Sequence, residues 1–209
     1  MTTANLLALL CIPDSAVAGQ PREDHSVGDA VARNAIAASK GQATSLSAYT
    51  TIAAGSAHTC ALTTSGGAEC WGYNLFGQLG NGTTTDRTTP VEVSGLSSGV
   101  AAIAAGSHHT CALVTSGGVK CWGHNGSGQL GDGTFTNRIT PLDVSGLSGG
   151  VTAIAAGYYH TCALTASGGA KCWGYNEYGQ LGNGNVGDSY TPVAVVTSIL
   201  CLPLSLKAP

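Results

Sequence analysis

The sequence predicts an all-β protein made of three tandem 51-residue units, each a four-stranded blade of the β-propeller type. The first observation is a repeat: residues 53–62 read AAGSAHTCAL, and the pattern returns at offsets of 51 as AAGSHHTCAL and AAGYYHTCAL. A fixed period of this size indicates a propeller or a solenoid, and solenoid coils usually repeat at shorter periods. The second observation is composition, because 31 Gly with only 2 Phe and 1 Met favour short strands joined by glycine turns.

Each repeat is expected to contain four short strands. In the second repeat we expect them at residues 100–105, 110–114, 119–123 and 141–144. The intervening sequences SGG, NGSGQLGDG and SGLSGG are rich in the residues that strand connections require. Four strands in about fifty residues make one propeller blade. The three repeats are therefore placed at residues 46–96, 97–147 and 148–196, which together span 46–196.

Two segments lie outside the repeats. Residues 1–45 form an N-terminal extension, and residues 197–209 an apolar C-terminal strand or cap. Residues 6–12 (LLALLCI) resemble the apolar part of an export signal, but no Lys or Arg precedes them. This segment is either an atypical signal or a strand or helix arm of the mature protein. Both apolar ends suit strand donation to a neighbouring copy.

The charge and motif content excludes several classes of function. The net charge is −3 and the 8 Lys and Arg are scattered, which argues against nucleic acid as a partner. No run reaches the roughly 18 apolar residues of a membrane helix. The carboxylates are few and mostly single, and a nucleophile elbow, a P-loop and a dinucleotide glycine pattern are missing from the sequence. We therefore expect no catalysis and no cofactor, and a protein as the partner.

The cysteines predict one disulfide inside each blade. Cys60 and Cys70 lie at equal distances from Ser65, so a hairpin centred there places them opposite one another. Opposed residues at such a position have Cα atoms about 4.5 Å apart, near the lower end of what a disulfide spans. The same spacing recurs in the other repeats and predicts the pairs Cys60–Cys70, Cys111–Cys121 and Cys162–Cys172. An even count of 8 Cys indicates an oxidising compartment, and hence an extracellular or cell-surface location.

Two cysteines remain, and a metal site is the rival interpretation for the others. Cys11 and Cys201 either pair with each other or bond neighbouring subunits. His58 shares a strand face with Cys60, and Cys70 lies opposite Cys60, so each repeat offers three candidate ligands. Their spacing differs from that of a zinc knuckle, and we therefore favour disulfides and no metal. The histidines are then structural residues, namely His58, His109 and His160.

Three further repeated or motif positions have a structural and a functional interpretation. The tryptophan after each second cysteine either packs between blades, with its N–H bonded to backbone, or forms a ligand-stacking platform. Because the position repeats in every unit, we favour packing for Trp71, Trp122 and Trp173. The repeated asparagines are expected to hold loop backbone through their amides, at Asn74, Asn125 and Asn176. Two N-x-Ser/Thr sequons are candidate glycosylation sites, although Asn-Gly is also turn chemistry, at Asn81 and Asn125.

The ordered series G-x-x-H-T-C-A-L, C-W-G-x-N-x-x-G-Q-L-G-x-G and T-P resembles the repeat of the regulator of chromosome condensation family across about residues 46–196. The resemblance implies a β-propeller of four-stranded blades that binds through loops on one face, without cofactor or catalysis. The cysteine pair departs from the nuclear members and resembles the exported bacterial branch, which includes a propeller inhibitor of β-lactamases. Nothing in the sequence matches the nucleotide-exchange surface of the nuclear members.

The number of repeats sets the expected function. The family's closed propeller has seven blades, so three blades leave two apolar faces open. The chain is then a fragment, a subunit of a closed ring, or a unit of an open filament. We expect a non-enzymatic, self-assembling structural or surface protein. The alternative is a protein-binding module of the inhibitor or adhesin kind, whose exposed loop contacts would be Phe76, Phe135, Tyr178 and Tyr190.

Overall fold

The computed structural model describes residues 48–196, which form three separate four-stranded antiparallel sheets. The predicted all-β class and the division into blades are confirmed. The extension at residues 1–45, the cap at 197–209, and Cys11 and Cys201 lie outside the described residues. Within residues 48–196, no helix has the length and apolar character that crossing a bilayer requires.

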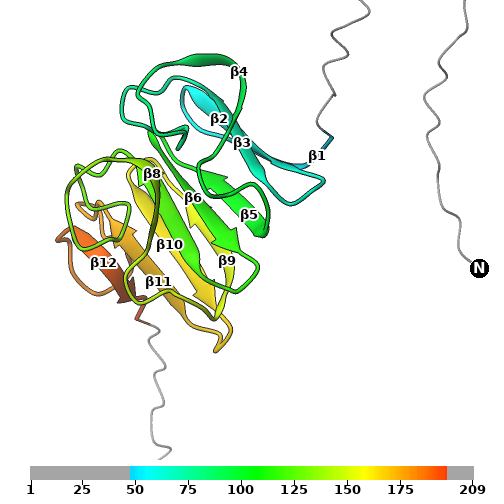
Figure 1. The fold of residues 1–209 in the computed structure, drawn as a ribbon. Helices are drawn as coiled ribbons and strands as arrows, with labels where there is room; N and C mark the ends of the chain where they lie inside the picture. Colours follow the sequence, from blue (N-terminus) through cyan, green and yellow to red (C-terminus); the bar gives the residue numbers. More distant parts are fainter. Residues whose placement is uncertain (1–47, 197–209) are drawn as a thin grey trace, which may run out of the picture. The chain divides into compact units, whose positions relative to one another are not determined.

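The sheets are referred to as blades 1, 2 and 3, in chain order (Figure 1). Blade 1 contains β1 (Tyr49–Ala54), β2 (His58–Thr63), β3 (Ala68–Gly72) and β4 (Arg87–Glu92). Blade 2 contains β5 (Val100–Ala105), β6 (His109–Val114), β7 (Val119–Gly123) and β8 (Arg138–Asp143). Blade 3 contains β9 (Val151–Ala156), β10 (His160–Thr165), β11 (Ala170–Gly174) and β12 (Ser189–Ala194).

Within each blade the strands pair in chain order as antiparallel neighbours. Short turns join the first three strands, and a longer loop joins the third to the fourth. In blade 2 the second strand, β6, is covered on both faces, and five of its six residues are buried, His109 among them. The fourth strand is the outer edge. In blade 2 it begins at Arg138, three residues before the predicted start at Pro141. Pro141 lies where the pairing register of β7 with β8 shifts, a position at which a missing N–H is tolerated.

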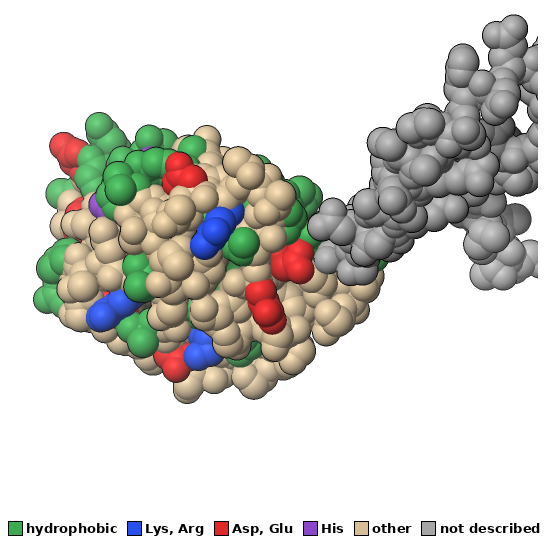
Figure 2. All heavy atoms as spheres, turned by 45° about the horizontal axis from the view of Figure 1, so that its top comes forward, with side chains coloured by type: hydrophobic (Ala, Val, Ile, Leu, Met, Phe, Trp, Pro, Cys, Tyr) green, Lys and Arg blue, Asp and Glu red, His purple; other side chains and the backbone are tan. Residues whose placement is uncertain are grey.

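The apolar core lies between the blades. One core cluster joins Cys60, Leu79 and Val93 of blade 1 to Ile103 and Trp122 of blade 2. A second cluster repeats this arrangement between blades 2 and 3, around Trp173. The face of the molecule in Figure 2 carries a few isolated charged side chains and no basic cluster. Each blade is therefore completed by its neighbour, as expected for a repeat architecture.

Candidate functional site

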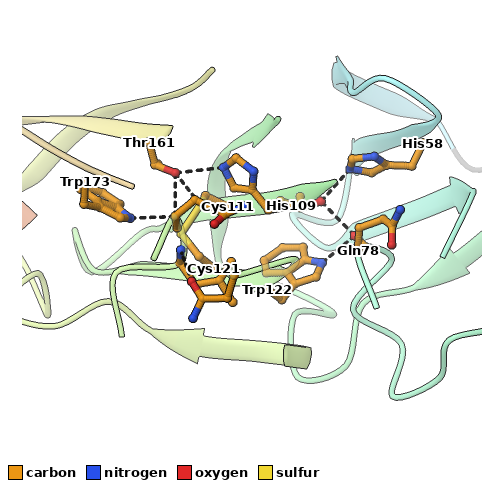
Figure 3. The surroundings of a disulfide bond; sticks show 12 residues. His58, Gln78, His109, Cys111, Cys121, Trp122, Thr161 and Trp173 are labelled. Atoms are coloured by element: carbon orange, nitrogen blue, oxygen red, sulfur yellow. Dashed lines mark hydrogen bonds between the residues drawn. A yellow bond between two sulfur atoms is a disulfide. The ribbon is translucent and has the colours of Figure 1, made fainter. Parts of the chain in front are cut away.

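The interface between blades 2 and 3 contains a continuous chain of hydrogen bonds (Figure 3). The Thr161 hydroxyl donates to the backbone carbonyl of Gln129 over 2.9 Å, and the Trp173 indole N–H donates to the same oxygen, also over 2.9 Å. His109 Nε2 lies 2.9 Å from the Thr161 oxygen. Because the only hydroxyl proton of Thr161 is directed to Gln129, His109 must donate through Nε2. This fixes the neutral tautomer of the histidine.

The interface between blades 1 and 2 repeats the same contacts. Thr110 and Trp122 both donate to the Gln78 carbonyl over 2.9 Å, and His58 Nε2 lies 2.9 Å from the Thr110 oxygen. The tryptophan lies directly on a glycine of the preceding blade, where a Cβ at Gly80 would come within 2.6 Å of the indole nitrogen. Only glycine allows this approach. The same tryptophan, threonine, histidine and glycine positions therefore define a reusable joint between blades.

The interface histidines are held without charge. Burial lowers the pKa of His109 to about 3 and the pKa of His58 to about 4. Their Nδ1 atoms are buried without a hydrogen-bond partner. Neutral, enclosed imidazoles that already donate through Nε2 serve as structural donors between blades, and this is the role that their repetition indicates.

The cysteines of each blade are bonded in the predicted pairs, Cys60–Cys70, Cys111–Cys121 and Cys162–Cys172, with Cα atoms 4.1 Å apart. Each bond crosses the hairpin between the second and third strands. Closing such a loop of about ten residues stabilises the fold by about 2–3 kcal/mol in the chain-entropy model. Residues 48–196 contain no group of three or more His, Cys, Asp or Glu arranged to hold a metal. The disulfides point to an oxidising compartment.

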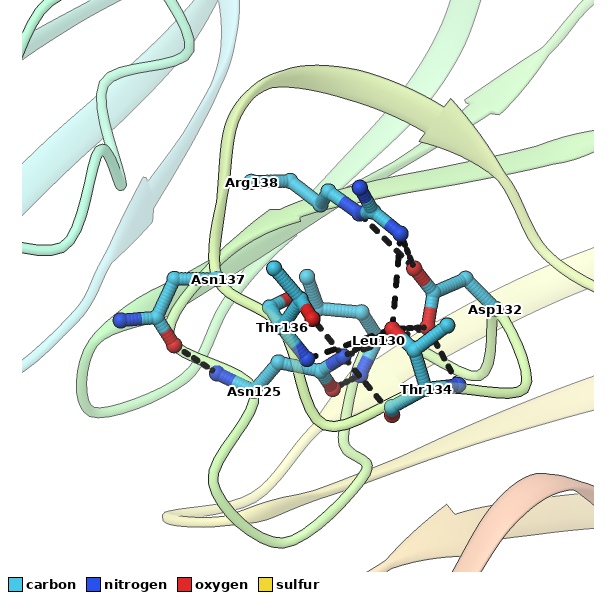
Figure 4. A network of polar contacts seen from close by, with 7 residues as sticks. All are labelled: Asn125, Leu130, Asp132, Thr134, Thr136, Asn137 and Arg138. Carbon is cyan, nitrogen blue, oxygen red and sulfur yellow. Dashed lines mark hydrogen bonds and ion pairs between the residues drawn. The ribbon is translucent and has the colours of Figure 1, made fainter.

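A buried asparagine organises the long loop of each blade (Figure 4). In blade 2, Asn125 Nδ2 donates to the carbonyls of Thr134 and Thr136 over 2.9 and 3.1 Å. Its Oδ1 accepts the Leu130 N–H over 3.0 Å. The side chain is fully buried and its amide holds the loop backbone as predicted, which favours that role over glycosylation at Asn125. Asn125 does lie in an N-x-Ser/Thr sequon. In the folded loop, however, the side-chain amide to which a glycan would be attached is hydrogen-bonded to backbone.

The same loop contains an ion pair that differs between blades. Arg138 contacts Asp132 Oδ2 through Nε and Nη2 at 2.9 and 2.8 Å. Burial alone would raise the pKa of Asp132, but hydrogen bonds from Thr134 and Arg138 lower it below the ordinary value. In blade 1 the equivalent of Asp132 is Asn81, whose Oδ1 accepts from the Thr83 N–H and hydroxyl. Asn81 is partly exposed, and its glycosylation stays a prediction.

The four predicted loop contacts fall into two groups. Phe135 and Tyr190 form an exposed pair with ring centroids 5.1 Å apart, and their side chains are 56% and 48% exposed. Tyr178 is 84% exposed on a different loop. Phe76 is half-buried, so the expectation that it is an exposed contact is wrong. Its ring lies between two histidines of blade 2, which local sequence could not reveal.

A row of aromatic rings, which sequence analysis did not identify, crosses one face of the three blades. It begins at Tyr73 and Phe76, continues through His108 and His124, and ends at four tyrosines of blade 3, with neighbouring centroids 4.4–6.4 Å apart. The tyrosines are Tyr158, Tyr159, Tyr175 and Tyr178. Aligning the repeats at the 51-residue offset would have given the signal, because all of these positions except that of Tyr158 are aromatic or histidine in more than one repeat.

The two outer faces of the described blades lack the cover that the inner faces have. Leu164 of blade 3 is 51% exposed, whereas its equivalent Leu113 in blade 2 is 6% exposed. Ile52 of blade 1 is 67% exposed, against 8% for its equivalent Ile103. Trp71 is half-buried, while Trp122 and Trp173 are fully buried. The outer faces of blades 1 and 3 thus carry the same residues as the internal joints, but without a neighbouring blade among the described residues.

Two family models described as "Regulator of chromosome condensation (RCC1) repeat" match most of the described chain. One covers residues 49–78, 100–129 and 151–180, and the other covers 67–113, 116–164 and 168–199. The chain belongs to the RCC1 repeat family. The second set of RCC1 matches begins at the third strand of one blade and continues into the next blade, so the family's sequence unit itself spans the joint.

Relatives of known function are larger RCC1 proteins. The chain is 37% identical over 146 residues to the ultraviolet-B receptor UVR8 of Arabidopsis thaliana, covering 69% of this chain and 33% of the receptor. It is 41% identical over 147 residues to the human probable E3 ubiquitin-protein ligase HERC4, covering 69% of this chain and 14% of the ligase. The chain thus spans a third or less of the length of these relatives.

Solved structures agree with the RCC1 assignment. Human WBSCR16 superposes with a TM-score of 0.64 at 28% identity, covering 71% of this chain and 38% of that one. Prp20p of Saccharomyces cerevisiae superposes with a TM-score of 0.64 at 26% identity, covering 72% of this chain and 39% of that one. Both matches support propeller blades, of which the described residues form an incomplete set.

Proposed function

We propose that the protein is a non-enzymatic extracellular or surface protein whose copies join head to tail, blade 1 of one copy packing on blade 3 of the next. The observation that carries this proposal is the repetition of one joint at both internal interfaces, with its two unused halves at the outer blades. The expected contacts follow from the repeat. Trp71 of a second copy donates to the Gln180 carbonyl, and Thr59 of that copy accepts from His160.

The glycines of blade 3 support a further blade at this position. A Cβ at Gly80 or Gly131 would come within 2.6 or 2.7 Å of the next blade's indole nitrogen, and both glycines have positive φ. Gly182 is their equivalent, with φ +61, yet the nearest atom to a Cβ there is Val195 Cγ1 at 3.1 Å. Gly179 likewise faces open space where Gly128 meets the backbone of Tyr190. Blade 3 therefore has the clearances that a docked tryptophan and edge strand require.

The chemistry of the faces matches that of the internal joints. Blade 1 presents Thr59 and Trp71 at the positions that Thr110 and Trp122 occupy in blade 2. The three disulfides support an oxidising location, which we take to be outside the cell. The cysteine pairs also resemble those of the exported bacterial branch of the family. Heterologous contacts of this kind produce a ring if the rotation closes and a filament if it does not.

A pair of surface variants tests the proposal. Ile52→Arg places an unpaired charge on the blade 1 face, and Leu164→Arg does the same on the blade 3 face. Light scattering after size-exclusion chromatography should find wild-type oligomers that grow with concentration, and monomers for each variant alone. An equimolar mixture should give a dimer and nothing larger, because each variant keeps one intact face.

Leu75→Arg is the control, since Leu75 is 59% exposed on a blade 1 loop away from both outer faces. It should assemble as the wild type does. A wild-type chain that remains monomeric at every concentration, or a variant mixture that does not dimerise, would remove the basis of the proposal.

The second candidate is a protein-binding module that uses one loop face. The exposed Phe135–Tyr190 pair favours it, because clustered aromatic side chains are typical of binding hot spots. A monomeric wild-type chain would favour this function over assembly.

A further inference from the structure

A cavity on blade 3 borders blade 2 at a position where the repeats differ. At the blade 1–blade 2 boundary, the Phe76 ring lies 5.3 Å from the His108 ring and 4.8 Å from the His124 ring, measured between centroids. Phe76 therefore fills the space between these two side chains. At the next boundary the residue equivalent to Phe76 is Ser127. Ser127 has no ring to place between the two side chains that follow, and it lines the cavity.

The cavity has a volume of about 460 Å³ and walls made of tyrosine rings. Tyr159 and Tyr175 occupy the positions of the two histidines, and Tyr158 and Tyr178 extend the walls. Neighbouring rings in this set meet at 86°, 78° and 72°. The remaining lining residues are Ser127, His160 and Gln180.

A carboxylate adjoins one wall of the cavity, although the lining itself has no carboxylate. Tyr175 donates a hydrogen bond to the Glu177 carboxylate. This bond, with the charges of Glu177 and Asp188, raises the pKa of Tyr175 to about 12, so the phenol stays neutral. Burial lowers the pKa of His160, so that ring is uncharged at neutral pH. The lining contains no Lys or Arg.

We propose that this tyrosine cavity binds an alkylated ammonium group, with the tyrosine faces around the cation and Glu177 as its counter-charge. Aromatic faces attract cations through the ring quadrupole, and several rings around one site suit a bulky, weakly hydrated cation. All the groups involved lie in one chain. Because His160 and Gln180 also belong to the blade 3 face proposed for assembly, binding is measured on the monomeric Ile52→Arg variant, whose blade 3 is unchanged.

Choline and its neutral isostere 3,3-dimethylbutan-1-ol are matched probes, because they differ in the charge of otherwise similar head groups. Isothermal titration calorimetry on the full chain carrying Ile52→Arg should give saturable choline binding at least about tenfold tighter than binding of the isostere. Glu177→Gln should weaken choline binding several-fold and leave binding of the isostere unchanged. Ser127→Phe should abolish binding of both probes, because it fills the cavity as Phe76 fills its counterpart.

Two further variants keep the test decisive. Tyr178→Ala removes an exposed wall without touching the core and should weaken choline binding, which guards against misfolding of the Ser127 variant. Phe135→Ala alters an aromatic side chain outside the cavity and should bind choline as the wild type does. Equal affinity for choline and the isostere, or choline binding that survives Ser127→Phe in a folded protein, would overturn the proposal.

Discussion

At the scale of single residues, each joint between blades depends on a histidine that is buried without charge. His109 donates through Nε2 to Thr161, and its Nδ1 is enclosed without a partner. Protonation of Nδ1 would create a buried charge with no acceptor for the new N–H. The joint is therefore built for the neutral form, and this has a consequence for stability in acid.

We predict that the protein loses stability as the pH falls from about 6.5 toward 4. The folded-state pKa values of His58 and His109 are lowered from 6.5 to about 4 and about 3, so between these limits the unfolded chain binds protons that the folded chain does not. Each such proton makes the free energy of unfolding fall by about 1.4 kcal/mol more for every pH unit of acidification. Urea unfolding at a series of pH values measures this slope.

His109→Gln is the matched variant for this prediction, because glutamine still offers an N–H to Thr161 but does not titrate. Its stability should depend less on pH than that of the wild type over the same interval, even if it is lower at pH 7. An unchanged slope in the variant would mean that other groups carry the acid sensitivity.

At the scale of an element, the long loop between the third and fourth strands differs among the blades in one polar pair. Blade 2 joins Arg138 to Asp132, whose side chain is 2% exposed. Blade 1 has Arg87 and Asn81 at these positions, and Arg87 Nε is buried without a hydrogen-bond partner. Blade 1 thus has the cation of the pair without its carboxylate.

Asn81→Asp should therefore stabilise the protein, because it supplies the partner that Arg87 lacks. We expect a gain of about 1 kcal/mol in the free energy of unfolding, at the upper end for a partly exposed ion pair. Asp132→Asn is the reciprocal variant and should destabilise, since it removes the same pair from blade 2. Urea denaturation at pH 7 measures both, and a loss of stability in Asn81→Asp would contradict the explanation.

Features that depend on local sequence could be predicted, whereas contacts between repeats could not. The hairpin that places Cys60 opposite Cys70 is local and symmetric, so both register and disulfide followed from spacing. The burial of Phe76 depends on side chains contributed by the next repeat, which no local pattern contains. The repetition of Asn125 predicted that its amide holds loop backbone, but its partners, the carbonyls nine and eleven residues later, could not be identified from the local sequon.

At the scale of the whole molecule, the described blades behave as a one-dimensional array, in which stability is the sum of blade terms and joint terms. The two joints within residues 48–196 are formed, and their equivalents on the outer faces are open. A change at an internal joint should therefore affect folding, whereas the same change at an outer face should affect only association.

Two equivalent glycines test this distinction. Gly131 and Gly182 both have positive φ, so alanine carries a similar backbone cost of about 1 kcal/mol at either position. At Gly131 the added Cβ also comes within 2.7 Å of the Trp173 indole nitrogen, so Gly131→Ala should lose clearly more stability in urea unfolding of dilute chains. Gly182→Ala should lose little beyond the backbone cost, since Val195 needs only a small shift. Sedimentation at high concentration should instead find that the Gly182→Ala variant associates with an affinity at least about tenfold lower than the wild type. The added Cβ would prevent Trp71 of a second copy from approaching. Normal assembly of Gly182→Ala would mean that copies of the chain meet at some other surface.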